Sequence, residues 1–149
     1  RLLSAASAQM CPHTANSGLR AAVAEAGLPC ETFIDGMAVR VDEATVYEPD
    51  VLLRCGPPVA DDCVEIVDPL IVVEVLSPSS RHKDTGGKLD DYFRLASVRH
   101  YLTVKTANRT VIHHHRREEG GELQTRIVRE GRVELQPPGL SVEVASLFS

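Results

Sequence analysis

A run of apolar residues that contains a single carboxylate constrains this chain more than any other feature. Residues 70–76 read Leu-Ile-Val-Val-Glu-Val-Leu and are rich in β-branched side chains. Such a run predicts a strand that is buried on both faces of a sheet. Glu74 lies inside this strand, and a buried carboxylate must be paired, neutralised or bound to a cation.

The rest of the chain alternates between helical and strand-like segments. The Ala-rich residues 18–26 predict a helix that ends at Gly27, and an apolar stripe predicts a second helix from about Asp84 or Gly87 to Leu95. Strands are expected at residues 31–34, 37–41, 51–54, 100–105, 110–116, 124–128 and 133–135. Asp35-Gly36 predicts a hairpin between the first two strands.

This order of elements predicts an α/β fold with a mixed β-sheet flanked by helices. The strands of the C-terminal half are expected to form an antiparallel meander. The length of 149 residues fits a single domain over residues 1–149.

Composition limits the classes of protein to which the chain can belong. The sequence has 16 basic and 21 acidic residues, a net charge of -5, which argues against coating nucleic acid by bulk electrostatics. Residues 1–80 carry a net charge of -8 and residues 81–149 a net charge of +3. Two explanations of this asymmetry stay open. The charges are ordinary surface charges, or the acidic first half supplies metal ligands and the basic second half binds phosphate.

Nothing in the sequence suggests a membrane or secreted protein. No apolar run approaches the ~20 residues of a membrane helix. Residues 1–11 do not resemble a secretory signal, and the absence of an initiator Met leads us to expect that the natural N-terminus is missing. We therefore predict a cytoplasmic protein whose four cysteines, Cys11, Cys30, Cys55 and Cys63, are reduced thiols.

A second carboxylate stands at the start of another predicted strand. Pro49-Asp50 precedes the apolar residues 51–53, and proline suits the first position of a strand. If this strand neighbours residues 70–76, Asp50 and Glu74 converge, and their oxygens suit Mg²⁺. The alternative is structural: Glu74 pairs with Arg54 or Arg99, and Asp50 caps a turn.

The spacing of these acids resembles the PD-(D/E)XK nuclease superfamily and, more narrowly, a bacterial family of restriction-endonuclease-like proteins. The matching stretches are Tyr47-Glu48-Pro49-Asp50, residues 71–79, Asp84-Thr85-Gly86-Gly87-Lys88, Tyr92 and Val98-Arg99-His100-Tyr101-Leu102. The resemblance implies a restriction-endonuclease-like sheet in which Asp50 and Glu74 bind Mg²⁺ or Mn²⁺. The backbone carbonyl of Val75 is a further expected ligand, DNA the expected substrate, and a homodimer the expected assembly.

The chain departs from the superfamily pattern at one position. The residue two positions after Glu74 is Leu76 rather than lysine. The resemblance implies that Lys88, on the following helix, replaces it as the catalytic cation. Asp84 and Tyr92 lie four residues on either side of Lys88, on the same helical face, and are expected to support it.

Two further features are less informative. Glu25 is a weak candidate for the metal site and is more simply a solvated helix residue. In the segment His113-His114-His115-Arg116-Arg117, His113 and His115 share one strand face, which is too few ligands for a closed zinc site. We expect residues 110–116 to form a solvated edge strand, which a second copy of the chain would cover.

These observations lead to two hypotheses. The first is a metal-dependent endonuclease that hydrolyses phosphodiester bonds, with Asp50, Glu74 and Lys88 as its catalytic residues. The alternative is a catalytically inactive module of the same fold for dimerisation or nucleic-acid binding, which the loss of the motif lysine at Leu76 favours.

Overall fold

The structure is a computed structural model that describes residues 2–78, 85–118 and 120–148, with side chains in the first helix from His13 onward. Its helices are α1 (Leu2–Ala26), α2 (Thr85–Phe93) and the short 3₁₀ helix η2 (Val144–Leu147). The strands are β1 (Cys30–Ile34), β2 (Ala38–Asp42), β3 (Thr45–Tyr47), β4 (Val51–Cys55), β5 (Glu65–Ile66), β6 (Ile71–Leu76), β7 (His100–Lys105), β8 (Thr110–His115), β9 (Gln124–Val128), β10 (Arg132–Leu135) and β11 (Leu140–Glu143).

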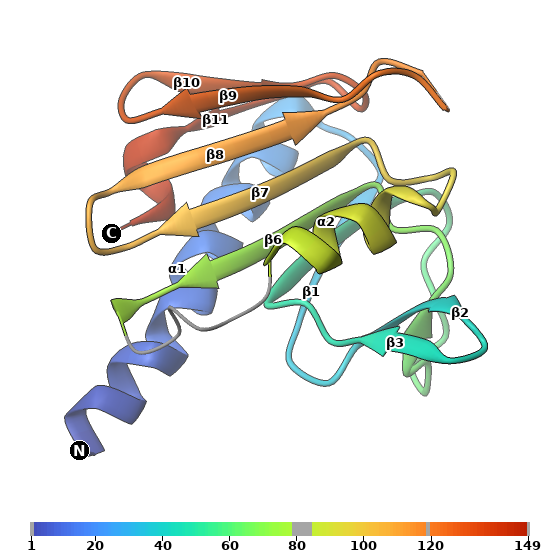
Figure 1. The fold of residues 1–149 in the computed structure, drawn as a ribbon, viewed down its shortest axis with the longest axis horizontal. Helices are drawn as coiled ribbons and strands as arrows, with labels where there is room; N and C mark the ends of the chain where they lie inside the picture. The colour runs from blue at the N-terminus through green and yellow to red at the C-terminus, as the bar shows by residue number, and fades with distance from the viewer. Residues whose placement is uncertain (1, 79–84, 119, 149) are drawn as a thin grey trace.

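A six-stranded sheet in the order β1-β4-β6-β7-β8-β9 forms the centre of the fold (Figure 1). β6 and β7 are parallel, and every other neighbouring pair in this sheet is antiparallel. The predicted mixed sheet is therefore confirmed, with β7, β8 and β9 as its antiparallel meander. β10 does not continue the meander, because it pairs with β11 in a separate two-stranded sheet.

The two faces of the central sheet are covered by different elements. α1 and the β10–β11 hairpin cover one face, and α2 packs on the other (Figure 1). Alternation along β6 supplies both apolar layers, because Ile71, Val73 and Val75 face α1 whereas Val72 faces α2. The prediction that this strand is buried on both faces is thus confirmed.

The predicted hairpin at Asp35-Gly36 is wrong. Both residues have the positive φ angles of a tight turn, 53° and 75°. The strands on either side nevertheless belong to different sheets, because β1 pairs with β4, whereas β2 pairs with β3 and β5. The local turn signal was correct, but strand pairing depends on the distant partners that each strand finds.

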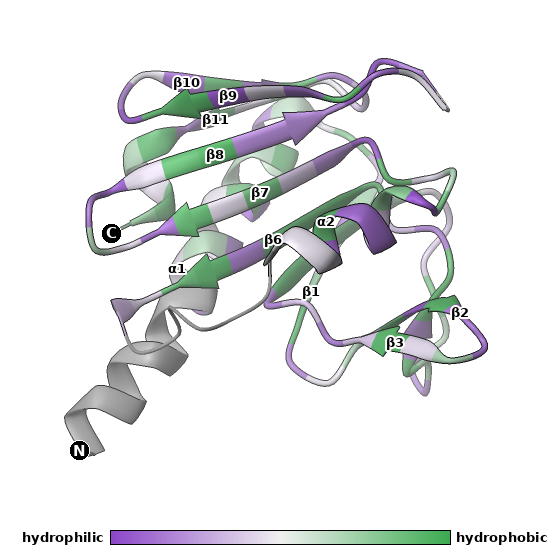
Figure 2. Ribbon diagram, in the orientation of Figure 1, coloured by the Kyte–Doolittle hydropathy of each residue, from purple (hydrophilic) through white to green (hydrophobic). Residues whose placement is uncertain are grey.

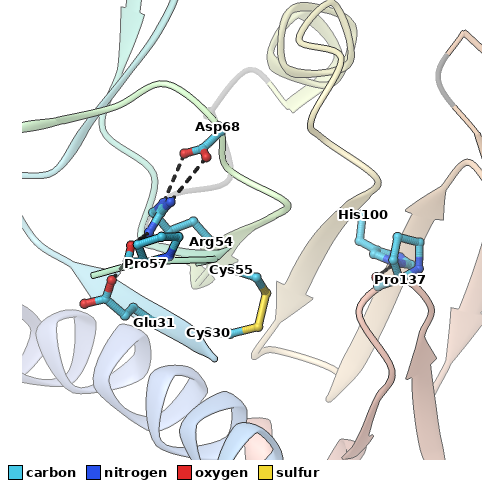
Figure 3. The surroundings of a disulfide bond; sticks show 8 residues. All are labelled: Cys30, Glu31, Arg54, Cys55, Pro57, Asp68, His100 and Pro137. Atoms are coloured by element: carbon cyan, nitrogen blue, oxygen red, sulfur yellow. Dashed lines mark hydrogen bonds and ion pairs between the residues drawn. A yellow bond between two sulfur atoms is a disulfide. The ribbon is translucent and has the colours of Figure 1, made fainter. Parts of the chain in front are cut away.

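The prediction that all cysteines are reduced is also wrong. Cys30 and Cys55 form a disulfide (Figure 3). The antiparallel register of β1 and β4 places these two residues directly opposite each other, although 25 residues separate them in sequence. Cys63 is a free, half-buried thiol.

The expectation of an edge strand at residues 110–116 is corrected as well. β8 pairs with β7 on one side and β9 on the other, so β9 forms this edge of the sheet. His113 and His115 do share one face, with ring centroids 4.7 Å apart, but His113 is only 2% exposed.

Within the described part of the chain, no helix is long and apolar enough to cross a membrane.

Candidate active site

The register of two neighbouring strands brings the two candidate carboxylates together. β4 and β6 are antiparallel, with Val51 opposite Val73, and continuing this register by one residue places Asp50 opposite Glu74. Because side chains alternate along each strand, both acids point to the α2 face of the sheet. Side chains opposite each other on one face of an antiparallel pair are close neighbours.

A backbone hydrogen bond fixes the position of Asp50. Its Oδ2 accepts a hydrogen bond of 2.7 Å from the amide of Val75, on β6. Asp50 therefore joins the start of β4 to the adjacent strand rather than capping a local turn. The same contact places Val75 at the site, where the predicted role of its carbonyl as a metal ligand stays a prediction.

Lys88 supplies the cation beside Glu74. Glu74 is 0% exposed, and the Nζ of Lys88 lies 3.3 Å from its Oε2. Lys88 lies on α2, 14 residues after Glu74 in the sequence, and the packing of α2 on the sheet brings the two side chains together.

The alternative ion pairs predicted for Glu74 do not form. Arg54 binds Asp68, with 3.1 Å between Nε and Oδ1, and also lies 3.6 Å from Glu31 (Figure 3). Arg99 instead donates a hydrogen bond to the carbonyl of Arg117. Glu74 thus has Lys88 as its basic partner among the residues that the structure describes.

Comparison with known proteins shows to which family the chain belongs. A sequence model of the Uma2 family, described as "Putative restriction endonuclease", matches residues 13–147. The chain belongs to the Uma2 family. Its resemblance to restriction-endonuclease-like proteins is therefore confirmed.

Two individual proteins show how far this similarity extends. The uncharacterized protein slr1290 of Synechocystis is 30% identical over 123 residues, which cover 82% of the chain. The chain spans 65% of the length of that relative. A crystal structure described as a "putative nuclease belonging to DUF820", from Anabaena variabilis, has a TM-score of 0.66 at 15% identity and covers 93% of this chain and 78% of its own. The second likeness shows a shared fold.

Tyr47 is a residue of the site that the sequence did not reveal. The ammonium of Lys88 lies 5.3 Å from the centre of the Tyr47 ring, close enough for a cation–π contact. The hydroxyl of Tyr47 donates a short hydrogen bond to Asp91, on α2, and Asp91 also accepts one of 3.2 Å from Arg94. The signal was present, because Tyr47 begins the Tyr-Glu-Pro-Asp stretch that resembles the Uma2 family.

Tyr92 lies in the wall of the site but does not bind Lys88 through its hydroxyl. Its ring is fully buried between Tyr47 and Tyr101, with centroids 5.3 and 5.6 Å away, and its hydroxyl makes no hydrogen bond with the described residues. Burial, and then the negative charge of Glu74, raise the pKa of Tyr92 well above its usual value. Tyr92 is therefore a neutral packing residue beneath the carboxylates.

The two remaining predicted positions are Asp84 and Glu25. Asp84 lies outside the described residues. Glu25 is exposed on α1, which covers the opposite face of the sheet, so it is a solvated helix residue.

The donor set at this site fits a hard divalent cation. Among the described residues, no group of three or more His, Cys, Asp and Glu side chains could hold a metal. The site has two carboxylates, Asp50 and Glu74. Mg²⁺ needs only one or two protein carboxylates, because it retains several of its waters. Their oxygen chemistry disfavours zinc, which prefers nitrogen and sulfur ligands.

Proposed function

We propose that this chain is a metal-dependent nuclease that hydrolyses phosphodiester bonds of DNA. The observation that carries the proposal is the constellation on the α2 face: Asp50 opposite Glu74, with the Lys88 ammonium 3.3 Å from Glu74. Membership of a restriction-endonuclease-like family supports the same reaction class.

Asp50 and Glu74 would hold Mg²⁺ or Mn²⁺, with the carbonyl of Val75 as a further oxygen ligand. Such an ion supplies Lewis-acid chemistry, because it acidifies water and offsets negative charge that develops on a phosphate. The Val75 amide keeps the Asp50 carboxylate in place by donating a hydrogen bond to its Oδ2.

Lys88 has two functions in this proposal. Its ammonium offsets the charge of buried Glu74, and it can orient an attacking water or stabilise charge on the pentavalent phosphate. It takes the place of the motif lysine that Leu76 replaces. The ring of Tyr47 limits the positions that the ammonium can adopt.

The Asp50→Asn variant tests this function. The amide oxygen can still accept the hydrogen bond from Val75, so the fold should persist, but the charged ligand is lost. We expect Mg²⁺-dependent cleavage of plasmid DNA to fall at least about 100-fold. Asp61→Asn, on an exposed loop, is the matched control and should cleave like the wild type.

Melting curves with and without Mg²⁺ separate catalysis from a structural role of Asp50. Mg²⁺ should raise the melting temperature of the wild type but not of Asp50→Asn, because only binding to the native state stabilises it. Removing one of two facing carboxylates should leave the metal-free stability level or higher. Clear destabilisation of Asp50→Asn, with no metal effect in either protein, would contradict the nuclease.

The second candidate function is an inactive module for dimerisation or nucleic-acid binding. The presence of Leu76 at the motif position favours it. Calorimetric titration with Mg²⁺ distinguishes the two, since the module predicts no heat of binding at this site.

A further inference from the structure

A cavity of about 250 Å³ lies beside the candidate active site, on the same face of the sheet. Its floor is formed by β7 and β8, where Thr103 pairs with Ile112, and its walls include Leu89 of α2 and Leu76 at the end of β6. Thr103 also pairs with Glu74 across the parallel strands β6 and β7. The cavity therefore begins one strand away from the buried carboxylate.

Lys105 gives this cavity a positive charge. The β6–β7 register pairs Lys105 with Leu76, so the lysine stands on the neighbouring strand beside the residue that replaces the motif lysine. None of the ion pairs between described residues involves Lys105. No Asp or Glu of the described chain lines the cavity. A phosphate group is the natural partner for this charge.

His114 gives the cavity a flat, uncharged surface. Its ring stacks on Tyr101 with an angle of 21° between the planes, and its Nδ1 lies 2.7 Å from the hydroxyl of Thr125. Burial lowers the pKa of His114, so the ring is neutral at pH 7. The neighbouring side chain of Ile112 extends this surface, which suits the face of a nucleobase.

The open position of the cavity follows from the short helix above the sheet. α2 packs over β6 and leaves the same face of β8 and β9 uncovered (Figure 1). Hydropathy along β8 changes from hydrophobic near its start to hydrophilic at its end (Figure 2). The cavity lining combines the apolar side chain of Ile112 with the polar side chains of Lys105 and His114. Its volume lies just below the ~300 Å³ at which pockets for drug-sized ligands begin, which suits one nucleotide.

We propose that this cavity is a nucleotide subsite. It holds the base of a nucleotide next to the scissile phosphate against His114 and Ile112, while Lys105 binds the phosphate of that nucleotide. This inference rests on the proposed function, because the adjacent Asp50 and Glu74 define which phosphate is cleaved. It names single-stranded DNA, or a strand with an unstacked base, as the form that enters the cavity.

Binding to a fluorescently labelled single-stranded DNA 12-mer tests the subsite. The anisotropy titrations are done in EDTA, so that neither metal binding nor cleavage contributes. We expect Lys105→Met to reduce the salt dependence of log K by about 0.7, the value for one lost contact with a phosphate of a single strand. His114→Ala should weaken binding about tenfold, as expected when one base loses a stacking partner.

Arg129→Met is the matched control, because it removes one positive charge from an exposed position outside the cavity. It should alter the binding less than Lys105→Met does. Equal effects of Lys105→Met and Arg129→Met, together with unchanged binding by His114→Ala, would overturn the subsite. Circular dichroism of each variant confirms that it is folded.

The outcome is separable from that of the proposed function. If the wild type cleaves DNA but Lys105→Met has no specific effect on binding, the proposed nuclease function is supported and the nucleotide subsite is refuted. If Lys105→Met selectively weakens binding but the wild type cleaves no DNA, the subsite is supported and the chain is an inactive module.

Discussion

The contact between Lys88 and Glu74 can be tested most sharply by removing its positive charge. The Glu74 side chain is 0% exposed and that of Lys88 19%, with 3.3 Å between Nζ and Oε2. At an effective dielectric constant of 20, two unit charges at this distance attract each other by about 5 kcal/mol. Removing one partner of a buried pair costs about 3–5 kcal/mol. Because Lys88 is partly hydrated, we expect Lys88→Met to cost about 3 kcal/mol.

The two partners should not be equivalent. In Glu74→Gln the ammonium of Lys88 can turn toward solvent, so this variant should cost only about 1 kcal/mol. In Lys88→Met the fully buried carboxylate cannot reach water in the same way. The double variant should therefore be less destabilised than the sum of the two single variants, with a coupling of about 2 kcal/mol.

Urea unfolding in EDTA, followed by circular dichroism, measures these free energies in a chain that contains no Trp. For a chain of 149 residues, a loss of about 3 kcal/mol corresponds to a fall in melting temperature of about 6–12 °C. Arg40→Met is the matched control, since Arg40 forms a 2.9 Å ion pair with Glu65 in which both side chains are at least one-third exposed. This control should lose less than about 1 kcal/mol.

Three results would refute the reasoning. The first is a cost of Lys88→Met no larger than that of Arg40→Met. The second is an equal cost for Lys88→Met and Glu74→Gln, and the third is strict additivity in the double variant. Each would mean that the ammonium does not offset a buried charge, and Lys88 would lose its place in the proposed site.

Three further predictions concern other parts of the molecule. Burial lowers the pKa of His100 to about 4 and that of His113 to about 3, below the ~6.5 of an unfolded chain. The unfolded state therefore binds more protons than the native state below about pH 6.5. The free energy of unfolding should fall as the pH drops from about 6.5 toward 4. Urea titrations that give the same free energy of unfolding across this pH range would contradict the prediction. Asp50→Ala should cost about 1–3 kcal/mol in thermal unfolding, because the Val75 amide loses its acceptor, whereas Asp50→Asn should not; equal losses would argue against this role of the hydrogen bond. Light scattering at micromolar concentration should show a homodimer, whose sheet-edge contact would use β9 rather than β8, and a monomer would remove this prediction.

The neutral state of the buried histidines follows from their hydrogen bonds. The Nε2 of His100 lies 2.8 Å from the carbonyl of Pro137, which can only accept, so this nitrogen carries the proton. The Nδ1 of neutral His100 must then accept from the Nε2 of His113, at 2.8 Å. The Nδ1 of His113 is left as a buried acceptor without a partner among the described residues. Protonation of His100 at Nδ1 would set two donors against each other, and protonation of His113 at Nδ1 would bury a charged N–H group without an acceptor among the described residues. Both effects agree with the predicted loss of stability in acid.

The sequence alone determined much of the central framework. The β-branched residues of 70–76 indicated a strand with two buried faces, and the structure has β6 there with apolar layers on both sides. The apolar stripe after it indicated α2, and alternation indicated β7, β8 and β9. These elements were predictable because hydrophobic periodicity records which faces of a segment are buried, and burial is the dominant favourable term in folding.

Part of the candidate site was predictable for the same reason. A carboxylate inside an apolar strand requires compensation, which singled out Glu74, and the resemblance to a nuclease family added Asp50 and Lys88. The sequence could not show that Lys88, rather than Arg54 or Arg99, reaches Glu74. All three are basic residues at plausible spacing, and only the packing of α2 on the sheet brings one of them within 3.3 Å.

The tertiary structure decided the features that depend on which segments become neighbours. The turn at Asp35-Gly36 formed, yet β1 paired with β4, and that pairing placed Cys30 opposite Cys55. β9 covered the edge of β8, the ring of His113 became buried against His100, and β3 brought Tyr47 beside Lys88. Local patterns specify the conformation of a segment and the face it buries. The choice of partner strand is settled by many long-range contacts made together, and no single segment encodes it.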